Sequence, residues 1–202
     1  EEGFIRKDVV TNTYLSHKFS QTNSLDINFD YLAYGNHTYQ DITNATYDGS
    51  MQPLGAALIL HSKQPTLIDV YSVKADHAYT FKRGLKVESG IKSSWVATDN
   101  NAQFKDGLWL TDTTRSNHFF YKENINAAYI TADQSFKTKW EIRVGLRAEQ
   151  TNAEGIQYVH SISFTRHYLS LFPTAYITYK ADSNNQFELN YGRRIERPAY
   201  QR

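Results

Sequence analysis

The sequence predicts an all-β fold: an antiparallel up-and-down meander that forms part of a transmembrane β-barrel. Apolar and polar residues alternate with a period of two over long stretches, as in strands with two unlike faces. Short polar connections alternate with long ones, and aromatic residues gather beside the short ones. Outer-membrane barrels place short turns on one side, long loops on the other and aromatic girdles at both interfaces.

Composition supports this class and excludes several others. The 202 residues carry a net charge of +1 and contain no cysteine, which argues against nucleic acid as a partner and excludes a disulfide framework or thiol chemistry. No apolar run approaches the roughly 18 residues of a membrane helix. The mean hydropathy of −0.60 still fits a membrane barrel, because lipid-facing and lumen-facing residues average out along each strand.

We expect eight strands within one barrel segment that covers residues 1–202. The clearest spans 140–152, where Trp140, Ile142 and Val144 alternate with charged residues. The least clear spans 120–136, whose Ala-rich middle also suits a helix. The predicted strands lie at about 11–19, 25–34, 66–81, 85–98, 120–136, 140–152, 169–181 and 186–196.

The connections between these strands set the predicted topology. Four are short, at 20–24, 82–84, 137–139 and 182–185, and three are long, at 35–65, 99–119 and 153–168. The segment 54–61, "LGAALILH", looks like a strand, but a spanning strand there would reverse this alternation. We therefore assign it to the outer loop, as one strand of a hairpin above the membrane.

Aromatic residues flank all four short connections. If the strands pair in order, these aromatic residues lie at one level and form an interfacial girdle. The alternative is that the aromatic residues cap the core of a soluble β protein. The residues are Phe19, Phe81, Phe136, Trp140, Tyr179 and Phe187.

Three stretches resemble a known family. "IDVYSVKADHAYTFKRGLKVESGIKSSWVATDNN", "FFYKENINAAYITADQSFKTKWEIRVGLRAEQTNAEG" and "YLSLFPTAYITYKADSNNQFELNYGRRIERPAY" are similar to the barrels of TonB-dependent outer-membrane receptors of Bacteroidetes, and more narrowly to the outer membrane protein beta-barrel family. The likeness covers roughly residues 66–200. It implies a non-enzymatic protein of the outer membrane, without a cofactor, that takes up a nutrient with energy delivered by TonB.

The resemblance also implies that the chain is a section of a larger receptor. In the family, an "R-R-I-x-R-P" strand is followed by further strands, and a plug domain fills a barrel of about 22 strands. Outer-membrane lipid, the plug domain and TonB are therefore the expected partners of the parent protein. The sequence does not distinguish among iron complexes, glycans, vitamins and peptides as the nutrient.

Two groups of residues are candidate sites. Polar-face charges on two strands are expected to face the lumen and the plug: Lys86, Glu88, Lys92, Glu141, Arg143, Arg147 and Glu149. Loop residues that suit stacking on a sugar or an apolar ligand are Trp109, Arg115, Phe119, Phe120 and Tyr121; alternatively, these aromatics form a cluster that only holds the loop together.

Other chemistry has weaker support in the sequence. The seven histidines lack metal-ligand spacing, so no metal site is predicted, although His160 and His167 share a loop. Glu196 lies among arginines, as in an anion site or in an ion-pair ladder of a barrel wall. A soluble or small-barrel ligand-binding module is the alternative function. An outer-membrane barrel enzyme is a further alternative, but Asp76 and His77 are adjacent and point to opposite faces of a strand.

Overall fold

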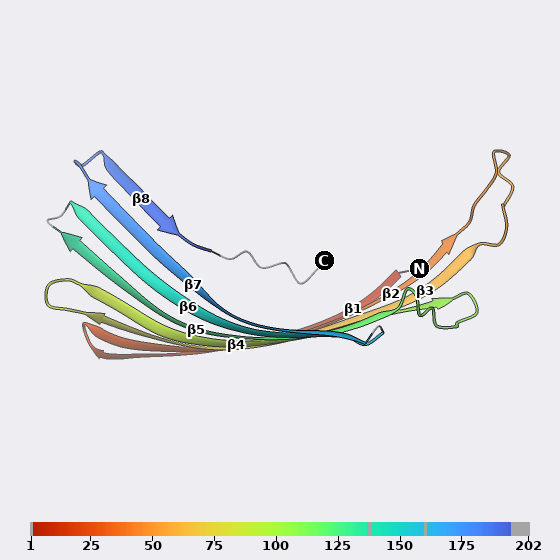
Figure 1. Ribbon diagram of the computed structural model, residues 1–202, viewed down its shortest axis with the longest axis horizontal. Helices are drawn as coiled ribbons and strands as arrows, with labels where there is room; N and C mark the ends of the chain where they lie inside the picture. Colours follow the sequence, from red (N-terminus) through yellow and green to blue (C-terminus); the bar gives the residue numbers. More distant parts are fainter. Residues whose placement is uncertain (1, 137–138, 160, 195–202) are drawn as a thin grey trace.

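The computed structural model describes residues 2–136, 139–159 and 161–194, which form one eight-stranded sheet. Each strand is antiparallel to its sequence neighbours, so the predicted all-β meander is confirmed. Figure 1 shows a curved, twisted trough with the short turns at one end and the long loops at the other. The strands are β1 (Glu2–Ser20), β2 (Asn23–Asn44), β3 (Leu58–Thr80), β4 (Lys86–Asp106), β5 (Asn117–Phe136), β6 (Trp140–Gln157), β7 (Ile162–Lys180) and β8 (Gln186–Gly192).

The described part of the sheet is open. β1 pairs only with β2, and β8 pairs only with β7. The Ala-rich segment 120–136 lies within β5 and is extended throughout. The short connections fall where they were predicted, although residues 137–138 of one turn and 195–196 of the last predicted strand lie outside the described residues. No helix among the described residues has the length and hydrophobicity to cross a membrane.

Most strands are longer than predicted at the loop end. β2 and β3 contain 22 and 23 residues, and the long connections shrink to 45–57, 107–116 and 158–161. The segment 35–44 is mostly polar on both faces, so it lacks the regular alternation that reveals a strand. Its backbone nevertheless pairs with β3 from Gly35 opposite Leu67 to Asn44 opposite Leu58.

The segment 54–61, assigned to the outer loop as one strand of a hairpin, is a hairpin strand only in its second half, which pairs with 41–44 of β2, and that half is not confined to the loop. Leu58 to His61 belong to β3, which continues without a turn through "SKQPT". Pro65 made this stretch look like a turn because proline has no N–H to give to the ladder. The strand accommodates it where the pairing with β4 is interrupted, between Lys63 and Thr66.

The register divides the sheet into two faces. All the described residues that are buried lie on the same face, which we call the inner face; it is the face on which side chains crowd in a curved sheet. The opposite face is the outer face. The buried residues are Leu60, Ser62, Ser72, Thr98, Glu123, Ile125, Ala127, Thr151, Ala153 and Gly155.

The outer face carries an apolar band that is clearest on β6 and β2. On β6 it runs from Trp140 to Ala148 and ends at Gln150; on β2 it runs from Leu25 to Ala33. These nine-residue spans match the roughly 9–11 residues with which a tilted strand crosses a membrane. Beyond the band, β2 continues to Asn44, about 35 Å farther at about 3.3 Å per residue.

Aromatic rings lie along both edges of this band. At the turn end, Phe136, Trp140, Tyr179 and Phe187 occupy consecutive partner positions on β5 to β8, and the Trp140 and Tyr179 rings are 4.5 Å apart. At the loop-side edge, Tyr31, Tyr71 and Trp95 are neighbours on β2 to β4. The second row lies in the middle of the strands, so no short connection marks it in the sequence.

Candidate functional site: the inner face and the loop end

A polar cluster occupies the middle of the inner face. The Tyr129 hydroxyl on β5 donates to Asp76 Oδ1 on β3 over 2.5 Å. Lys74 Nζ lies 2.6 Å from Asp76 Oδ2, and the Arg147 guanidinium lies 5.1 Å from the Tyr129 ring centroid. Arg147 Nε also donates to Glu149 Oε1 over 2.6 Å. The cluster therefore links β3, β5 and β6.

This arrangement depends on a glycine in the intervening strand. Tyr129 is the register partner of Gly90 on β4. A Cβ atom at Gly90 would lie 2.5 Å from the Tyr129 ring, well inside van der Waals contact. The missing side chain lets the ring lie across β4 and reach Asp76.

A second set of ion pairs lies closer to the turns. Arg143 Nη2 is 2.5 Å from Asp133 Oδ2, and Lys180 Nζ is 2.5 Å from Glu141 Oε1. Lys86 pairs closely with Glu88. Opposite charges on neighbouring strands, or two residues apart on one strand, thus neutralise each other on a concave polar face.

The structure places all seven sequence-selected charges on the inner face. Lys92 lies in register between Lys74 and Ala127. The sequence did not reveal the inner-face contacts of Tyr129, Asp76 and Asp133, although each has the polar-face parity of a predicted strand. Nor did it reveal the inner-face contacts of β1 and β2, which are Tyr14 with Asp26 and Asn12 with Asn28 and Asp30.

A hollow of about 630 Å³ opens on the inner face beside this cluster. Arg147, Glu149, Phe172 and Arg193 line it, together with Gly145. A Cβ atom at Gly145 would lie 2.7 Å from Thr174 Oγ1, so the glycine keeps the floor low. The hollow offers both charge signs and an aromatic face to whatever packs against the trough.

Trp109 lies at the tip of the β4–β5 loop in a defined position. Its indole stacks on the His61 imidazole, with centroids 4.0 Å apart and planes 8° apart, and His61 Nδ1 lies 2.6 Å from Asp41 Oδ1. Trp109 has a φ of 64°. Asp106 holds this tight turn by accepting bonds from the N–H groups of Leu108 and Leu110.

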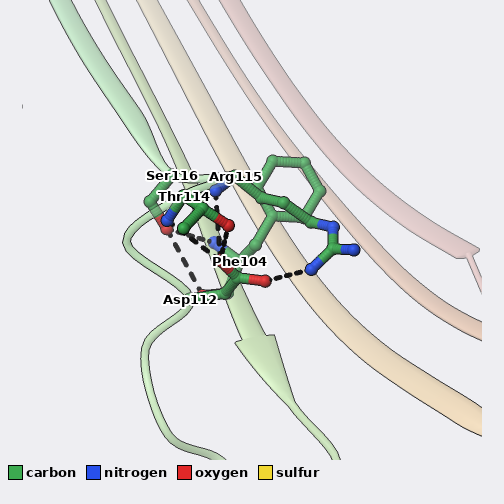
Figure 2. A network of polar contacts seen from close by, with 5 residues as sticks. All are labelled: Phe104, Asp112, Thr114, Arg115 and Ser116. Atoms are coloured by element: carbon green, nitrogen blue, oxygen red, sulfur yellow. Dashed lines mark hydrogen bonds and ion pairs between the residues drawn. The ribbon is translucent and has the colours of Figure 1, made fainter.

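The other side of the same loop is held by Asp112, as Figure 2 shows. Its carboxylate accepts bonds from the backbone N–H groups of Thr114 and Arg115, and the Arg115 guanidinium pairs closely with it. Hydrogen bonds from the Thr114 hydroxyl and then from Arg115 lower the pKa of Asp112 to about 2. Ser116 ties this turn to the backbone of Phe104 on β4.

The structure does not bring the five loop candidates together. Phe119 and Tyr121 lie on the inner face, with rings 6.5 Å apart, whereas Phe120 lies on the outer face below the Lys122 ammonium. Arg115 is engaged with Asp112. The reason is that β5 begins at Asn117, so these aromatics alternate between faces and do not share one loop surface.

The remaining candidates are the histidines and Glu196. No group of three or more metal-ligating side chains occurs within the described ranges. His167 is on β7 and contacts Asn152, while His160 and Glu196 fall outside the described residues. The site therefore consists of a paired-charge inner wall and a β4–β5 loop whose turns are held by the carboxylates of Asp106 and Asp112.

Comparison with known proteins agrees with this architecture. The sequence matches the outer membrane protein beta-barrel family over residues 17–202. No curated protein matches it at a significant level.

Solved structures share the fold at low sequence identity. The ferric-catecholate import receptor Fiu from E. coli K12 superposes with a TM-score of 0.73 at 8% identity, over 94% of this chain and 33% of that one. The ferric citrate transporter FecA gives 0.66 at 11% identity, over 89% and 26%. The ferric yersiniabactin uptake receptor FyuA from Yersinia pestis gives 0.52 at 14%, over 88% and 27%.

The chain thus spans a quarter to a third of the length of these receptors. Their likeness at such identity shows the fold. The family match covers most of the sequence and agrees with the membrane-height apolar band and the curved antiparallel sheet. This chain, a protein of the outer membrane, belongs to the outer membrane protein beta-barrel family.

Proposed function

We propose that this chain forms eight strands of the barrel wall of a TonB-dependent receptor, of the kind the sequence resembles in Bacteroidetes, that imports a nutrient. The main support for this proposal is the contrast between the outer and inner faces of the sheet. The outer face has an apolar band of membrane height, whereas the inner face has charges paired across strands, including Arg143 with Asp133 and Lys180 with Glu141.

An inner wall of this kind suits contact with a plug domain. Paired charges keep the wall hydrated and low in net charge, so a plug can detach from it without leaving unpaired ions in a dry interface. The hollow beside Arg147 and Glu149 gives a plug segment a place to dock. TonB would then act on the plug and not on this wall.

The loop end is the proposed ligand entrance. Asp106 and Asp112 pre-organise the β4–β5 loop, which lowers the entropy lost when a ligand binds. The exposed residues Leu108, Trp109 and Leu110 lie at its tip. The structural relatives are named for ferric chelates, which makes these the first ligands to test, ahead of glycans, vitamins and peptides.

Uptake by cells tests this function. A strain that lacks the complete gene should lose growth on one nutrient of such a panel, and the intact gene should restore it only when TonB is present. Replacement of Trp109 by Ala should weaken uptake, while Phe81→Ala at the opposite end of the sheet should not. Uptake that persists without TonB would refute the energy-coupled function.

A further inference from the structure

We propose that the hollow on the inner face of β5 to β8 is a binding site for a carboxylate group of an organic acid. The site consists of a groove across the strands and, along its loop-side edge, a row of large side chains that includes two arginines. The carboxylate belongs to a solute in the lumen or to an Asp or Glu side chain of the plug. The plug as a source rests on the proposed function, whereas the solute does not.

Small residues at consecutive partner positions form the groove. The four register partners on the inner face are Thr131 of β5, Gly145 of β6, Thr174 of β7 and Gly192 of β8. A Cβ atom at Gly145 would lie 2.7 Å from Thr174 Oγ1 and 3.2 Å from Thr131 Cγ2, so a side chain at this position would fill the groove. The hollow has a volume of about 630 Å³, which suits a small organic ligand.

Large side chains stand along the loop-side edge of this groove. The next inward residues toward the loops are Tyr129 on β5, Arg147 on β6 and Phe172 on β7, which are again register partners. Two contacts hold Arg147 in place: its Nε donates to Glu149 Oε1 over 2.6 Å, and its guanidinium lies 5.1 Å from the Tyr129 ring centroid. A guanidinium oriented in this way loses little entropy when an anion binds.

Arg194 extends the same row beyond the end of β8. The pairing of β8 with β7 runs to Gly192, and the Arg193 N–H continues it by donating to Pro173 O over 3.2 Å. This antiparallel register brings Arg194 opposite Phe172, so Phe172 lies between two arginines in the row. Arg193 and Arg194 both line the hollow.

The lining of the hollow has an excess of positive charge. It contains three arginines against one glutamate, which is a net charge of +2. Glu149 pairs with Arg147, whereas neither Arg193 nor Arg194 forms an ion pair with another residue of the described ranges. Guanidinium groups bind carboxylates through two parallel hydrogen bonds, so these two arginines offer a site for one carboxylate.

The other lining groups favour an organic acid over inorganic phosphate. The rings of Phe172 and Tyr129 line the hollow and give the hydrocarbon part of a ligand an apolar surface to cover. The carboxylate of Glu149 lies in the same lining, and it repels a doubly charged phosphate more than a singly charged carboxylate. We therefore expect a ligand with its carboxylate at Arg194 and its apolar part on the Phe172 ring.

Ligand binding by the complete protein in mild detergent tests the solute as the source. The probe is isophthalate, a benzene ring with two carboxylates, and its neutral diamide is the control ligand; saturation-transfer NMR should detect binding of isophthalate only. Arg194→Gln should weaken this binding about tenfold, as expected for the loss of one charged hydrogen-bonded contact. Arg166→Gln removes an arginine from the inner face of β7 outside the hollow and should leave the affinity unchanged. All variants should keep the same strand signal in circular dichroism.

Cross-linking tests the plug as the source. A water-soluble carbodiimide couples a lysine amine to a carboxylate that contacts it, so Arg194→Lys in the complete protein should link to the acidic plug residue that fills the site. Arg143→Lys is the positive control, because Arg143 Nη2 lies 2.5 Å from Asp133 Oδ2 and a link to Asp133 should form. Peptide mass spectrometry identifies both links.

Two results support the site, separately or together, and distinguish the sources. Isophthalate binding that depends on Arg194 assigns the site to a solute, and a link from Arg194→Lys to the plug assigns it to a plug side chain. Neither result depends on uptake. A protein that binds isophthalate but imports nothing with TonB would therefore refute the proposed function and not this site.

Four results would overturn the proposal. The protein could give neither isophthalate binding nor a link to the plug while Arg143→Lys still couples to Asp133. Arg166→Gln could weaken binding as much as Arg194→Gln, or inorganic phosphate could displace isophthalate at equal concentration; either result would indicate a general attraction of anions to the inner face. Arg194→Lys could also link to a carboxylate of the barrel wall, which would make Arg194 one half of an ion pair between strands.

Discussion

At the scale of single residues, the inner face contains aromatic rings that lie over glycines of the neighbouring strand. Tyr129 crosses β4 above Gly90 to reach Asp76, and Phe164 similarly covers its partner Gly155 on β6, where a Cβ atom would lie 2.2 Å from the ring. Glycine normally weakens a strand, but Gly90 and Gly155 leave the space that an aromatic ring from the neighbouring strand fills.

Gly90→Ala should therefore destabilise the sheet. The added methyl overlaps the Tyr129 ring, so the ring must move and its bond to Asp76 must lengthen. We expect a loss of about 1–3 kcal/mol in the free energy of unfolding, the usual cost of overpacking, measured by urea titration in detergent micelles. Gly35→Ala is the control, because its nearest neighbour would be Leu67 Cδ2 at 3.4 Å. If both variants lose the same free energy of unfolding, the contact between Gly90 and the Tyr129 ring does not contribute specifically to stability.

Asp112 predicts a pH dependence of the β4–β5 loop. Its pKa is lowered from 3.8 to about 2, first by the Thr114 hydroxyl and then by Arg115. The opened loop therefore binds a proton more readily than the closed loop, so the contribution of Asp112 is complete above about pH 4 and is lost as the pH falls through about 2.

Fluorescence of Trp109 can follow this change in a protein with Trp95→Phe and Trp140→Phe. Quenching by acrylamide should rise between pH 4 and pH 2 as the loop opens. The additional change Asp112→Asn removes the titrating group, and quenching should then be high already at pH 5. A rise of the same size in the Asp112→Asn protein over this range would assign the transition to another acid.

At the scale of elements, the long strands have a membrane part and an external part with different residue patterns. Within the membrane part, lipid and lumen impose opposite demands on successive residues, which is why 140–152 was predictable from Ile142, Val144 and Leu146. In the external part both faces meet water. The segment 35–44 is therefore mostly polar, and its pairing with β3 identifies it as a strand.

The same reasoning explains which site residues could be predicted. Arg143, Arg147 and Glu149 were assigned to one face because their parity within a clear strand fixes it. The bond between Tyr129 and Asp76 was not predictable, because it joins residues 53 positions apart and skips a strand. The loop candidates were grouped incorrectly in space because polar residues around Phe119 concealed the start of β5.

A charge placed in the apolar band tests the assignment of the faces. Val144 is 48% exposed on the outer face, so Val144→Arg would put a guanidinium into lipid. We expect a cost of about 2–4 kcal/mol in the free energy of unfolding from bilayers. Thr131→Arg, close to Val144 on the adjacent strand but on the inner face, should cost much less. A Thr131→Arg cost as large as that of Val144→Arg would contradict the assignment.

At the scale of the whole molecule, two surfaces of the described sheet lack partners. β1 and β8 each present one unpaired edge, and the outer band exposes residues such as Ile91, Val144 and Leu189. Unpaired edges and large apolar patches both promote association in water. Lipid and further strands of a barrel would satisfy both.

The isolated chain should consequently not be a monomer in plain buffer. Analytical ultracentrifugation should show oligomers or aggregates without detergent, and a detergent-bound species once micelles are added. Sedimentation as a stable 23.3 kDa monomer in plain buffer would contradict a lipid-facing outer surface and favour a soluble β domain.

The most direct test of the central claim is the depth and facing of individual residues in a bilayer. The sequence contains no cysteine, so spin labels can be attached to single cysteines at Val144, Thr131 and Ile156 of the complete protein. A barrel wall predicts that oxygen relaxes the Val144 label strongly while a water-soluble nickel chelate does not. The chelate should reach the Ile156 label, which lies on the same face beyond the band, and oxygen should affect the Thr131 label least. If the chelate relaxes the Val144 and Ile156 labels equally, the outer face does not meet lipid and the chain is not part of a membrane barrel wall.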